Sequence, residues 1–437
     1  MLQHLRGMNT HRVVIVGGGF AGLYAAKSFR SKDVSITIVD RRNFHLFQPL
    51  LYQVATGALS PGEIASPLRY VLRNRKEISV VLGEVTDIDP AARKLVLADG
   101  SQIAYDSLLI ATGATHSYFA HPEWAQHAPG LKTVEDATEI RARILLAFER
   151  AETAATDEER RAHLTFAIVG GGPTGVEVAG ALAEISRDTL KHDFRNIDTA
   201  SARICLIEGS PRLLHAFDPA SSAAAERQLR SLGVEIHTGS TVTAIDADGV
   251  SFQHEGAETR VNAKTVIWAA GVQASPLGKL LAERTGVSLD RAGRVIVEPD
   301  LSLPGHREIL VAGDLASGST NGKPWPGVAP TAMQHGAYAA KLIVNRLRDR
   351  TTAPFRYWNK GSLATIGRNK AVAEVGSFRF SGIFAWLAWL LIHIFYIIEF
   401  ENRMLIVFQW AYDYFTFNRG ARLITGPDAQ HQAKPHS

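Results

Sequence analysis

The most regular hydrophobic pattern in this chain is an apolar run that leads into glycines and then into small residues at helical spacing. It is HRVVIVGGGFAGLYAAKSF at residues 11–29, and a second apolar run, SITIVD, ends at Asp40. Short apolar runs are typical of buried strands, and the glycines are typical of a tight turn before a helix. The pattern therefore predicts strand, turn, helix and strand in that order.

The same pattern recurs further along the chain. LTFAIVGGGPTGVEVAGAL occupies residues 164–182, and RICLIEGS at residues 203–210 supplies the apolar run that follows it. The two glycine segments align without gaps, which indicates a duplication at the scale of a domain. Apolar runs at residues 107–114, 265–272 and 308–316 alternate with helical segments. This alternation predicts an α/β fold with parallel sheets and two Rossmann-like domains.

The pattern changes near residue 355. Residues 362–367 and 370–375 read as strands, and an aromatic, apolar tail begins at Phe378. Residues 383–398 are 16 almost wholly apolar positions, whereas a helix that spans a bilayer needs about 20. Acidic Glu399 follows directly. We therefore expect a pair of in-plane helices at a membrane interface. A true span and a buried core or dimer helix are the alternatives.

Composition excludes several functional classes. The chain has 437 residues and a formal net charge of +4, which is too small to indicate a nucleic-acid partner. Its single cysteine, Cys205, lies in an apolar run, so we expect a buried strand residue and a reducing compartment. No cluster has metal-ligand spacing, so no metal site is expected. His393, in the apolar tail, is expected to be a packed or interfacial residue. The N-terminal residues show no apolar segment of the kind that a secretory leader has.

The first glycine motif fits a dinucleotide. Gly17 allows the tight turn, Gly19 lets the backbone approach a pyrophosphate, and Gly22 lets the helix pack on the strand. The pyrophosphate is then attracted to the helix N-terminus. Asp40 stands where an acid that accepts hydrogen bonds from ribose hydroxyls is expected.

The second motif passes the same test with Gly170, Gly172 and Gly175, and Glu208 is its acid. An acid at this strand end repels a 2′-phosphate, so NADH is expected rather than NADPH. Arg212 follows four residues later, and binding of that phosphate by Arg212 is the alternative. Two dinucleotides in one chain indicate electron transfer between a nicotinamide and a flavin.

The chain resembles a known family. The order GGGFAG, Asp40, ATG, GGGPTGVE, Glu208, AGD is that of flavoproteins with two dinucleotide-binding domains. Residues 40–61, DRRNFHLFQPLLYQVATGALSP, are similar to the type II NADH dehydrogenases, which are non-proton-pumping NADH:quinone oxidoreductases. APTAMQHG, KGSLATIGRNKAVA and the aromatic C-terminus resemble the same family.

The resemblance implies an FAD-binding domain at residues 11–135 and 300–354 and an NADH-binding domain at 136–299 inserted in it. Residues 355–437 would form a membrane-associating region. FAD would bind without a covalent bond. The implied cofactor-binding residues are Gly17, Gly19, Phe20, Ala21, Gly22, Asp40, Arg41, Gln48, Pro49, Val85, Ala111, Thr112, Gly113, Asp314 and Ala329 for FAD, and Gly170, Gly172, Pro173, Thr174, Gly175, Glu177, Glu208 and Gly271 for NADH.

The resemblance also implies that hydride passes from NADH to FAD and that a membrane quinone is then reduced to quinol. The expected quinone region is Pro330, Thr331, Met333 and Gln334. The family often has a glutamine where this chain has Pro330, so Gln334 remains as the polar candidate. A homodimer bound to the lipid bilayer surface, on the cytoplasmic face of the inner membrane, is expected.

Glu177 has two interpretations. The segment from Thr174 to Glu177 fits a capping box at a helix N-terminus. The first motif has Tyr24 at the equivalent position, and in the resembling family the glutamate lies where nicotinamide meets flavin. Glu177 and Gln334 are therefore the candidate catalytic residues.

Two rival functions stay open. One is a soluble FAD-dependent reductase of an iron–sulfur protein, and the other is a non-catalytic flavoprotein redox sensor. A sulfide:quinone reductase or a disulfide reductase would need at least two cysteines, and the single cysteine of this chain argues against both.

Overall fold

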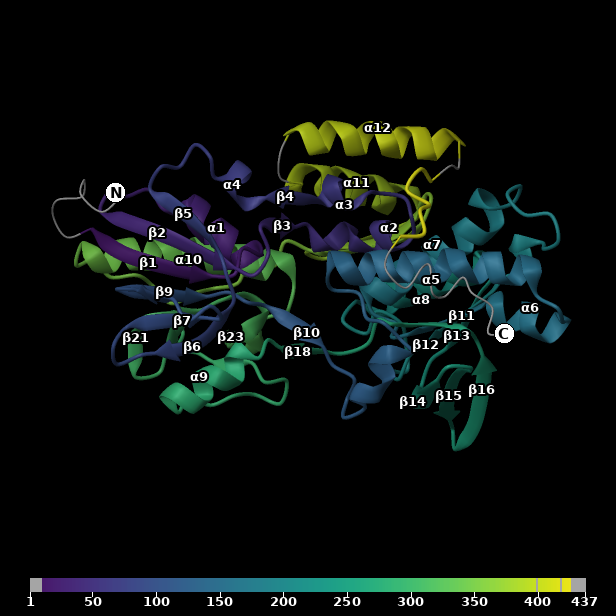
Figure 1. Ribbon diagram of the computed structural model, residues 1–437, viewed down its shortest axis with the longest axis horizontal. Helices are drawn as coiled ribbons and strands as arrows, with labels where there is room; N and C mark the ends of the chain where they lie inside the picture. Colours follow the sequence, from purple (N-terminus) through teal and green to yellow (C-terminus); the bar gives the residue numbers. More distant parts are fainter. Residues whose placement is uncertain (1–9, 398–399, 417–418, 426–437) are drawn as a thin grey trace. The chain divides into compact units, whose positions relative to one another are not determined.

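The computed structural model describes residues 10–397, 400–416 and 419–425. Residues 1–9, on which the leader expectation rests, lie outside the described residues, as do Ile398 and Glu399 of the tail. The chain divides into two compact units (Figure 1). As far as the structure describes them, unit 1 comprises Met1–Leu46, Ala65–Thr115 and Val272–Asn359, and unit 2 comprises Phe47–Ile64, His116–Gly271 and Lys360–Ser437.

A six-stranded sheet forms the centre of unit 1. Its strands in spatial order are β20 (Ser302–Leu303), β21 (His306–Val311), β9 (Ser107–Ile110), β1 (His11–Val16), β2 (Val34–Asp40) and β5 (Ile78–Leu82). All the pairings except β20 with β21 are parallel. Parallel strands buried on both faces need continuous apolar sequence, which is what VVIV and SLLI supply.

Different elements cover the two faces of this sheet (Figure 1). Helices α1 (Phe20–Ser28) and α10 (Ala329–Leu347) lie on one face and pack closely together, because Gly336 approaches the backbone of Ala21. The antiparallel strands β6 (Val85–Asp89), β7 (Lys94–Leu97) and β8 (Gln102–Ala104) cover the other face. Smaller elements of the unit are β3 (Phe44–Leu46), β4 (Ala65–Pro67), α4 (Leu68–Val71), α9 (Leu277–Thr285), β19 (Val295–Ile296), η5 (Gly313–Leu315), β22 (Ala316–Ser317), β23 (Ser319–Thr320) and β24 (Lys323–Pro324).

Unit 2 contains a second parallel sheet, with the order β13 (Val234–His237), β12 (Arg203–Ile207), β11 (Thr165–Val169) and β17 (Thr265–Trp268). Its apolar residues on one face pack against the antiparallel strands β14 (Ser240–Asp246), β15 (Gly249–His254) and β16 (Ala257–Asn262). Cys205 is buried in β12, which confirms the expectation of a strand residue.

The helices of unit 2 include α5 (Val134–Thr153), α6 (Asp157–His163), α7 (Pro173–Glu184) and α8 (Pro219–Ser231). Helix α7 continues into a π-helical turn, η3 (Ile185–Thr189), which accounts for the long spacing between the second glycine motif and its acid. The remaining elements of unit 2 are η1 (Gln48–Leu50), α2 (Leu51–Ala55), α3 (Pro61–Ile64), η2 (Pro122–Gln126) and η4 (Thr199–Ser201). A short ribbon that pairs β10 (Ala114–His116) with β18 (Val272–Ala274) belongs to unit 1 except for His116.

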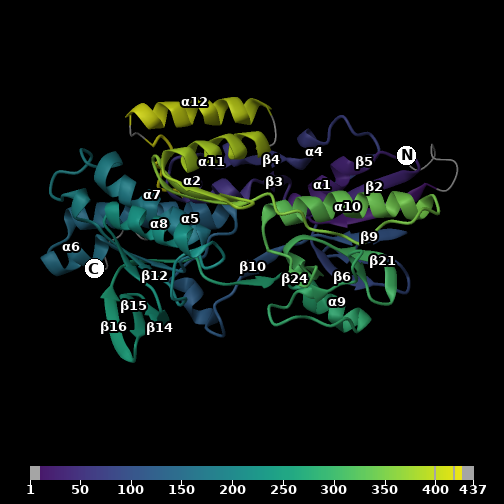
Figure 2. The same ribbon diagram turned by 180° about the vertical axis from the view of Figure 1, so that it is seen from behind.

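The C-terminal part of unit 2 is an antiparallel sheet with two helices. The strands are β25 (Ser362–Gly367), β26 (Lys370–Val375) and β27 (Phe378–Ser381), and the helices are α11 (Ile383–Tyr396) and α12 (Phe400–Thr416). Helix α11 packs on the sheet, and α12 lies beyond α11 (Figures 1 and 2). Among the described residues, every helix is too short or too polar to cross a bilayer. His393 packs against Trp389 and Phe47, as expected for a packed histidine.

The parallel strand pairings predicted from the apolar runs are therefore confirmed in both main sheets. The two antiparallel three-stranded layers, β6–β8 and β14–β16, were not anticipated. Their sequences are short and polar on one side, since each strand has one face on a core and the other in solvent.

Candidate functional site

The first glycine turn is built by two close backbone approaches. Gly17 has a φ of +104°, and a Cβ atom placed there would lie 2.5 Å from the carbonyl oxygen of Ala111. A Cβ atom on Gly22 would lie 1.8 Å from the carbonyl oxygen of Gly17. Both positions therefore require glycine, because a side chain would force the turn and helix α1 apart.

The second glycine turn repeats these contacts one by one. Gly170 has a φ of +110°, and its added Cβ would lie 2.7 Å from the carbonyl carbon of Ala269. A Cβ on Gly175 would lie 1.8 Å from the oxygen of Gly170. The duplication seen in the sequence is thus a duplication of geometry, since equivalent glycines meet equivalent backbone atoms.

The two acids make the same hydrogen bonds in their respective motifs. Asp40 accepts from the backbone N–H groups of Gly18 at 2.5 Å and Arg42 at 2.7 Å. Glu208 accepts from Gly171 at 2.5 Å and Ser210 at 2.6 Å. A carboxylate has about four lone-pair directions, so each acid keeps acceptor capacity for ribose hydroxyls.

Both helix N-termini are suited to a pyrophosphate. The N-cap residues are Gly19 for α1 and Gly172 for α7, and neither supplies a side-chain cap. A Cβ atom on either N-cap glycine would meet no heavy atom of the described residues within 4 Å. Open space in front of a helix N-terminus, where N–H groups and the helix dipole favour an anion, fits a dinucleotide at each motif.

A third pair of equivalent turns follows the next strands. Gly113 ends the Ala111-Thr112-Gly113 turn with a φ of +68°, and Gly271 has a φ of +69° at the corresponding place in unit 2. The hydroxyl groups of Thr112 and Ser275 are 2.5 Å apart. The sequence expectation that ATG belongs with the first glycine motif is therefore consistent with its position beside Gly17.

Two buried histidines that the sequence reasoning missed support the turns of unit 1. His45 Nδ1 donates to the carbonyl oxygen of Gly18 at 2.9 Å, and its ring contacts Phe20 edge to face. Gly313 N–H, next to Asp314, donates to Nδ1 of His335 at 3.1 Å. Burial lowers the pKa of His45 to about 4 and that of His335 to about 3, so both act as neutral hydrogen-bonding supports. A buried histidine that holds a loop has no local sequence signature.

The structure contradicts the capping box predicted at Thr174–Glu177. Helix α7 begins at Pro173 with Gly172 as its N-cap, so Thr174 is the second helical residue and Glu177 the fifth. A capping acid would have to be the third. Glu177 instead accepts a hydrogen bond from the backbone N–H of Thr365 in β25. The desolvation of its carboxyl raises the pKa of Glu177 well above its ordinary value.

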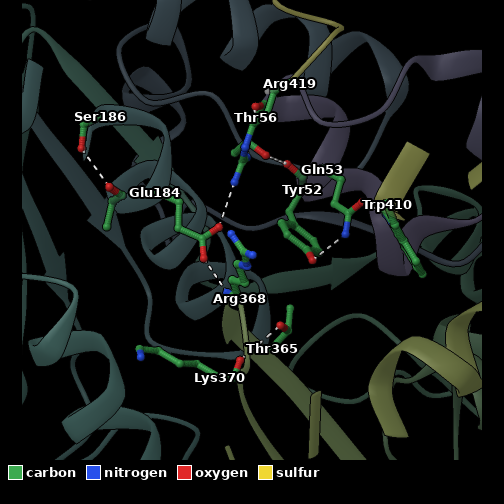
Figure 3. Close-up of polar contacts among 11 residues, drawn as sticks. Tyr52, Gln53, Thr56, Glu184, Ser186, Thr365, Arg368, Lys370, Trp410 and Arg419 are labelled. Atoms are coloured by element: carbon green, nitrogen blue, oxygen red, sulfur yellow. Dashed lines mark hydrogen bonds and ion pairs between the residues drawn. The ribbon is translucent and has the colours of Figure 1, made fainter. Parts of the chain in front are cut away.

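A second acid on α7 has a different environment (Figure 3). Glu184 accepts from the backbone N–H of Arg368 at 2.5 Å and forms an ion pair with Arg419 at 3.0 Å. Arg419 also donates to the carbonyl oxygen of Thr56 at 3.3 Å. The side chains of Glu184 and Arg419 are 21% and 12% exposed, so the pair is largely shielded from water.

Tyr52 lies beside these acids in a chain of polar contacts (Figure 3). Gln53 donates to the Tyr52 hydroxyl at 2.9 Å, and Trp410 donates to the amide oxygen of Gln53 at 2.8 Å. Burial raises the pKa of the Tyr52 hydroxyl well above its ordinary value, and the nearby charge of Glu177 adds to this effect. Tyr52 is therefore a neutral phenol within electrostatic range of Glu177.

The predicted quinone residues occupy the first turns of α10. Thr331 and Met333 are buried, and the Thr331 hydroxyl has no hydrogen-bond partner among the described residues. Gln334 donates to the carbonyl oxygen of Trp358 and accepts from its N–H, both at 2.9 Å. Its amide thus holds a backbone segment, which is a tethering role. Pro330 is the second residue of the helix, a position that proline tolerates.

The other predicted cofactor residues are distributed between the units. Arg41 is exposed directly after β2, whereas the Val85 side chain is buried in the core, which leaves its backbone for a ligand. Gln48 and Pro49 form the 3-10 turn η1 in unit 2, where Gln48 donates to the carbonyl oxygen of Lys132 at 3.1 Å.

One group of metal-ligating type occurs among the described residues. The ligand atoms of Cys205, Glu235 and His237 lie within 4.8 Å of one another. Both carboxylate oxygens of Glu235 already accept from Arg203 at 2.7 Å, and burial raises the pKa of the Cys205 thiol to about 12. A cation would have to compete with a guanidinium and a thiol proton, so the group does not favour a metal.

Comparison with known proteins agrees with these features. The family model described as "Pyridine nucleotide-disulphide oxidoreductase" matches residues 11–336, and the one described as "NDH2 C-terminal domain" matches residues 359–419. A solved structure of NDH2 from Plasmodium falciparum in complex with NADH has the same fold, with a TM-score of 0.85 and 21% identity over 95% of this chain and 100% of that one.

Two similar relatives are bacterial. The type II NADH:quinone oxidoreductase NdhA of Mycobacterium tuberculosis is 46% identical over 95% of this chain and 89% of its own length. The type II NADH:quinone oxidoreductase of Staphylococcus aureus is 29% identical over 83% and 89%. The resemblance inferred from the sequence is confirmed, and this chain belongs to the type II NADH:quinone oxidoreductase family.

Proposed function

We propose that this protein oxidises NADH and reduces a membrane quinone to quinol, with FAD as its bound cofactor. The overall reaction is NADH + H⁺ + quinone → NAD⁺ + quinol, in which two electrons and two protons reach the quinone. The observation that carries the proposal is the pair of equivalent glycine turns, each with its own acid and an open helix N-terminus. FAD bound at the first turn would accept hydride from NADH and pass two electrons on.

Binding in this proposal is the work of the glycine turns and their acids. Residues 11–135 and 300–354 would hold FAD, and residues 136–299 would hold NADH. Glu208 would accept from the ribose hydroxyls of NADH and would repel the 2′-phosphate of NADPH. Two N–H groups of the Arg212 guanidinium are already used, because they donate to the carbonyl oxygens of Phe217 at 2.6 Å and His215 at 2.7 Å.

Glu177 is the candidate for handling the proton that the reaction consumes. A raised pKa keeps a carboxyl group protonated to higher pH than an ordinary glutamate, so it is better suited to donate a hydrogen bond or a proton. The Thr365 N–H fixes one side of this carboxyl. Protonated Glu177 would hydrogen-bond the nicotinamide carboxamide or deliver a proton toward the quinone.

The first turn of α10 is the proposed quinone region. The buried hydroxyl of Thr331 offers a polar group that no described residue satisfies, and Met333 supplies an apolar surface. Gln334 would act indirectly there, by holding the backbone of Trp358.

Helices α11 and α12 are the proposed membrane contact. Each has exposed large apolar side chains at helical spacing, which a water-exposed helix does not ordinarily carry. On α11 these are Ile383, Phe384, Leu387, Leu391 and Phe395, and on α12 they are Met404, Leu405, Phe408, Tyr412 and Phe415. This surface would lie in the plane of the bilayer, from which a quinone must come.

Two finer points complete the proposal. We infer a homodimer, bound peripherally to the cytoplasmic face of the inner membrane. Sedimentation in mild detergent tests the dimer. Protease accessibility in inside-out and right-side-out membrane vesicles tests the face.

A steady-state assay tests the reaction. The purified FAD-loaded protein would be given NADH or NADPH together with a ubiquinone or a menaquinone analogue. We expect rapid NADH oxidation that requires quinone. Slow oxidation that quinone does not accelerate would contradict the proposal and favour a redox sensor, and a need for an iron–sulfur protein as acceptor would favour a soluble reductase.

A further inference from the structure

One face of helix α7 lies along strand β25 and contacts the strand and the residue that directly follows it, Arg368. Glu177, Gly180 and Glu184 share this face, because residues three, four and seven apart lie on one side of an α-helix. Glu177 accepts from the N–H of Thr365, and Glu184 accepts from the N–H of Arg368. Both contacts are in unit 2. They fix the position of α7, the helix that follows the second glycine motif, along the first strand of the C-terminal sheet.

Gly180 makes the close approach of α7 and β25 possible. A Cβ atom on Gly180 would lie 1.6 Å from the carbonyl oxygen of Ile366. A side chain at this position would therefore push the strand away from the helix. With glycine there, the backbone of β25 comes near enough for both carboxyl groups to reach its N–H groups.

The Glu184 end of the contact is the firmly held one. One carboxylate oxygen of Glu184 binds the Arg368 N–H, and the other binds the Arg419 guanidinium. A Cβ atom on Gly367 would lie 2.7 Å from the Glu184 carboxylate, so the strand end sits directly on this group. Burial raises the pKa of Glu184, and the charge of Arg419 opposes this shift. Hydrogen bonds from a charged donor such as Arg419 are stronger than neutral ones.

The Glu177 end depends on the same strand. Only two residues lie between Thr365, which donates to Glu177, and Arg368, which Glu184 holds. The Thr365 side chain is turned to the sheet and donates to the carbonyl oxygen of Lys370 at 3.4 Å, so the backbone N–H makes the contact with Glu177. A shift of β25 along α7 would therefore withdraw this N–H from the Glu177 carboxyl.

We propose that Glu184, together with Arg419, is a positioning residue for Glu177. By holding the Arg368 N–H, the ion pair fixes the register of β25 along α7 and so keeps the Thr365 N–H on the Glu177 carboxyl. This inference rests on the proposed function only in the role it gives to Glu177. The register itself, and its effect on the titration of Glu177, do not depend on turnover.

The charges around both carboxyl groups define the expected effect. Tyr52 is the titratable neighbour of Glu177, and Arg419, Arg368 and Asp188 face Glu184. The Thr365 N–H favours the ionised form of Glu177 and thus opposes its desolvation. Loss of this donor would raise the pKa of Glu177 further, and we expect a shift of about one pH unit.

The test is the pH dependence of thermal stability in the FAD-loaded, full-length protein. Melting temperatures from pH 4.5 to 9 would be compared between Glu177 and Glu177→Gln proteins, once in the wild-type background and once with Glu184→Ala. The difference curve reports the ionisation of Glu177 without NADH or quinone. We expect Glu184→Ala to move the midpoint of this curve to higher pH by about one pH unit.

Two further variants and a control complete the design. Glu184→Gln keeps an oxygen for the Arg368 N–H, so it is expected to restore most of the wild-type curve. If Glu184→Ala does not fold, Arg419→Met replaces it, with a smaller shift in the same direction. Glu226→Gln, which breaks an exposed ion pair with Arg230 on α8, is the matched control.

Either of two results would overturn the positioning role. One is a difference curve that is identical in both backgrounds, and the other is an equal shift in the Glu226→Gln control. The same variants would then be assayed with NADH and quinone. Suppose that Glu184→Ala shifts the difference curve but the wild-type protein shows no quinone-dependent turnover. This result would contradict the proposed function and would still support the positioning role.

Discussion

Glu177 combines three features that an ordinary surface glutamate does not have. It lies in the fifth position of α7, it accepts from a backbone N–H of a distant strand, and its carboxyl is desolvated. A charged form in such an environment is costly, so the desolvation favours the protonated form of Glu177. The first glycine motif has Tyr24 at the equivalent place, so this environment of an acid is particular to the second motif.

Replacement of this acid is the first prediction at the residue scale. Glu177→Gln is expected to leave FAD content unchanged and to slow NADH-dependent quinone reduction by about 10²-fold, a usual magnitude for the loss of a proton-transfer group. Stopped-flow measurement of flavin absorbance and steady-state turnover would check it. Full activity in the variant would contradict the role.

The same substitution makes a prediction about stability. Because the pKa of Glu177 is raised in the folded state, its contribution to stability is fully present below the unfolded pKa and is lost as pH rises through the folded value. Glu177→Gln is therefore expected to melt at a higher temperature than wild type at pH 8, and the gain should vanish near pH 4. Melting curves across this range measure it.

A second residue-scale prediction concerns cofactor choice. Glu208→Gln removes the negative charge beside the ribose site but keeps an acceptor oxygen for Gly171 and Ser210. We expect the preference for NADH over NADPH, measured as the ratio of kcat/KM values, to fall by about tenfold, which corresponds to about 1.4 kcal/mol. Asp40→Asn in the first motif serves as the comparison, and it should leave this ratio unchanged.

At the scale of elements, glycines decide how closely helices meet their neighbours. Gly22 and Gly175 let a helix start within van der Waals reach of its own turn, whereas Gly180 and Gly336 let helices approach other backbones. These four positions differ in sequence context but share one physical requirement, which is the absence of a Cβ atom.

Gly22→Ala tests that requirement. Its Cβ would lie 1.8 Å from the oxygen of Gly17, so α1 must shift and the pyrophosphate turn must open. We expect loss of FAD and a destabilisation of about 1–3 kcal/mol, as for other overpacked sites. Flavin absorbance per protein and urea unfolding measure these two effects. Gly62→Ala, whose Cβ meets nothing within 4 Å, is the control.

The exposed stripes of α11 and α12 give an element-scale prediction about membranes. Phe384→Ser combined with Phe408→Ser is expected to weaken binding to anionic phospholipid vesicles at least tenfold, since burial of one phenylalanine side chain is worth about 1.5–3 kcal/mol. Vesicle co-sedimentation checks this. Leu82→Ser with Ile296→Ser, two exposed apolar residues outside these helices, should leave binding intact.

At the scale of the whole molecule, membrane binding is expected to depend on pH. Burial raises the pKa of Asp413 on α12 to about 6, and Gln409, Arg419 and Glu63 face it. Below this value the group is neutral and enters an interface more readily, so vesicle binding should strengthen as pH falls from 8 to 5.5. Asp413→Asn should flatten the dependence. An unchanged slope in that variant would assign it to other groups.

The parallel strand pairings of the two main sheets could be predicted from the sequence because their signals are local. A run such as VVIV and the turn glycines at Gly17 and Gly170 act within a few residues, and their spacing to Asp40 and Glu208 is readable along the chain. The same locality failed at Thr174, where the letters of a capping box were present but the helix began at Pro173.

Contacts between distant segments could not be predicted in this way. His45 and His335 support glycine turns far from them in sequence, and Thr365 donates to an acid almost 190 residues earlier in the chain. Nothing in a sequence window marks such a pair, because each partner reads locally as an ordinary buried or strand residue.

The sequence by itself determined the α/β class, the doubled glycine turns, their acids and the family, because each of these follows from residues that act on near neighbours. The tertiary structure alone decided what Glu177 faces, which acid is paired with Arg419, and where Gln334 directs its amide. These depend on how strands and helices from distant parts of the chain are packed. Packing sets desolvation and hydrogen bonding, and through them the charge state of each group.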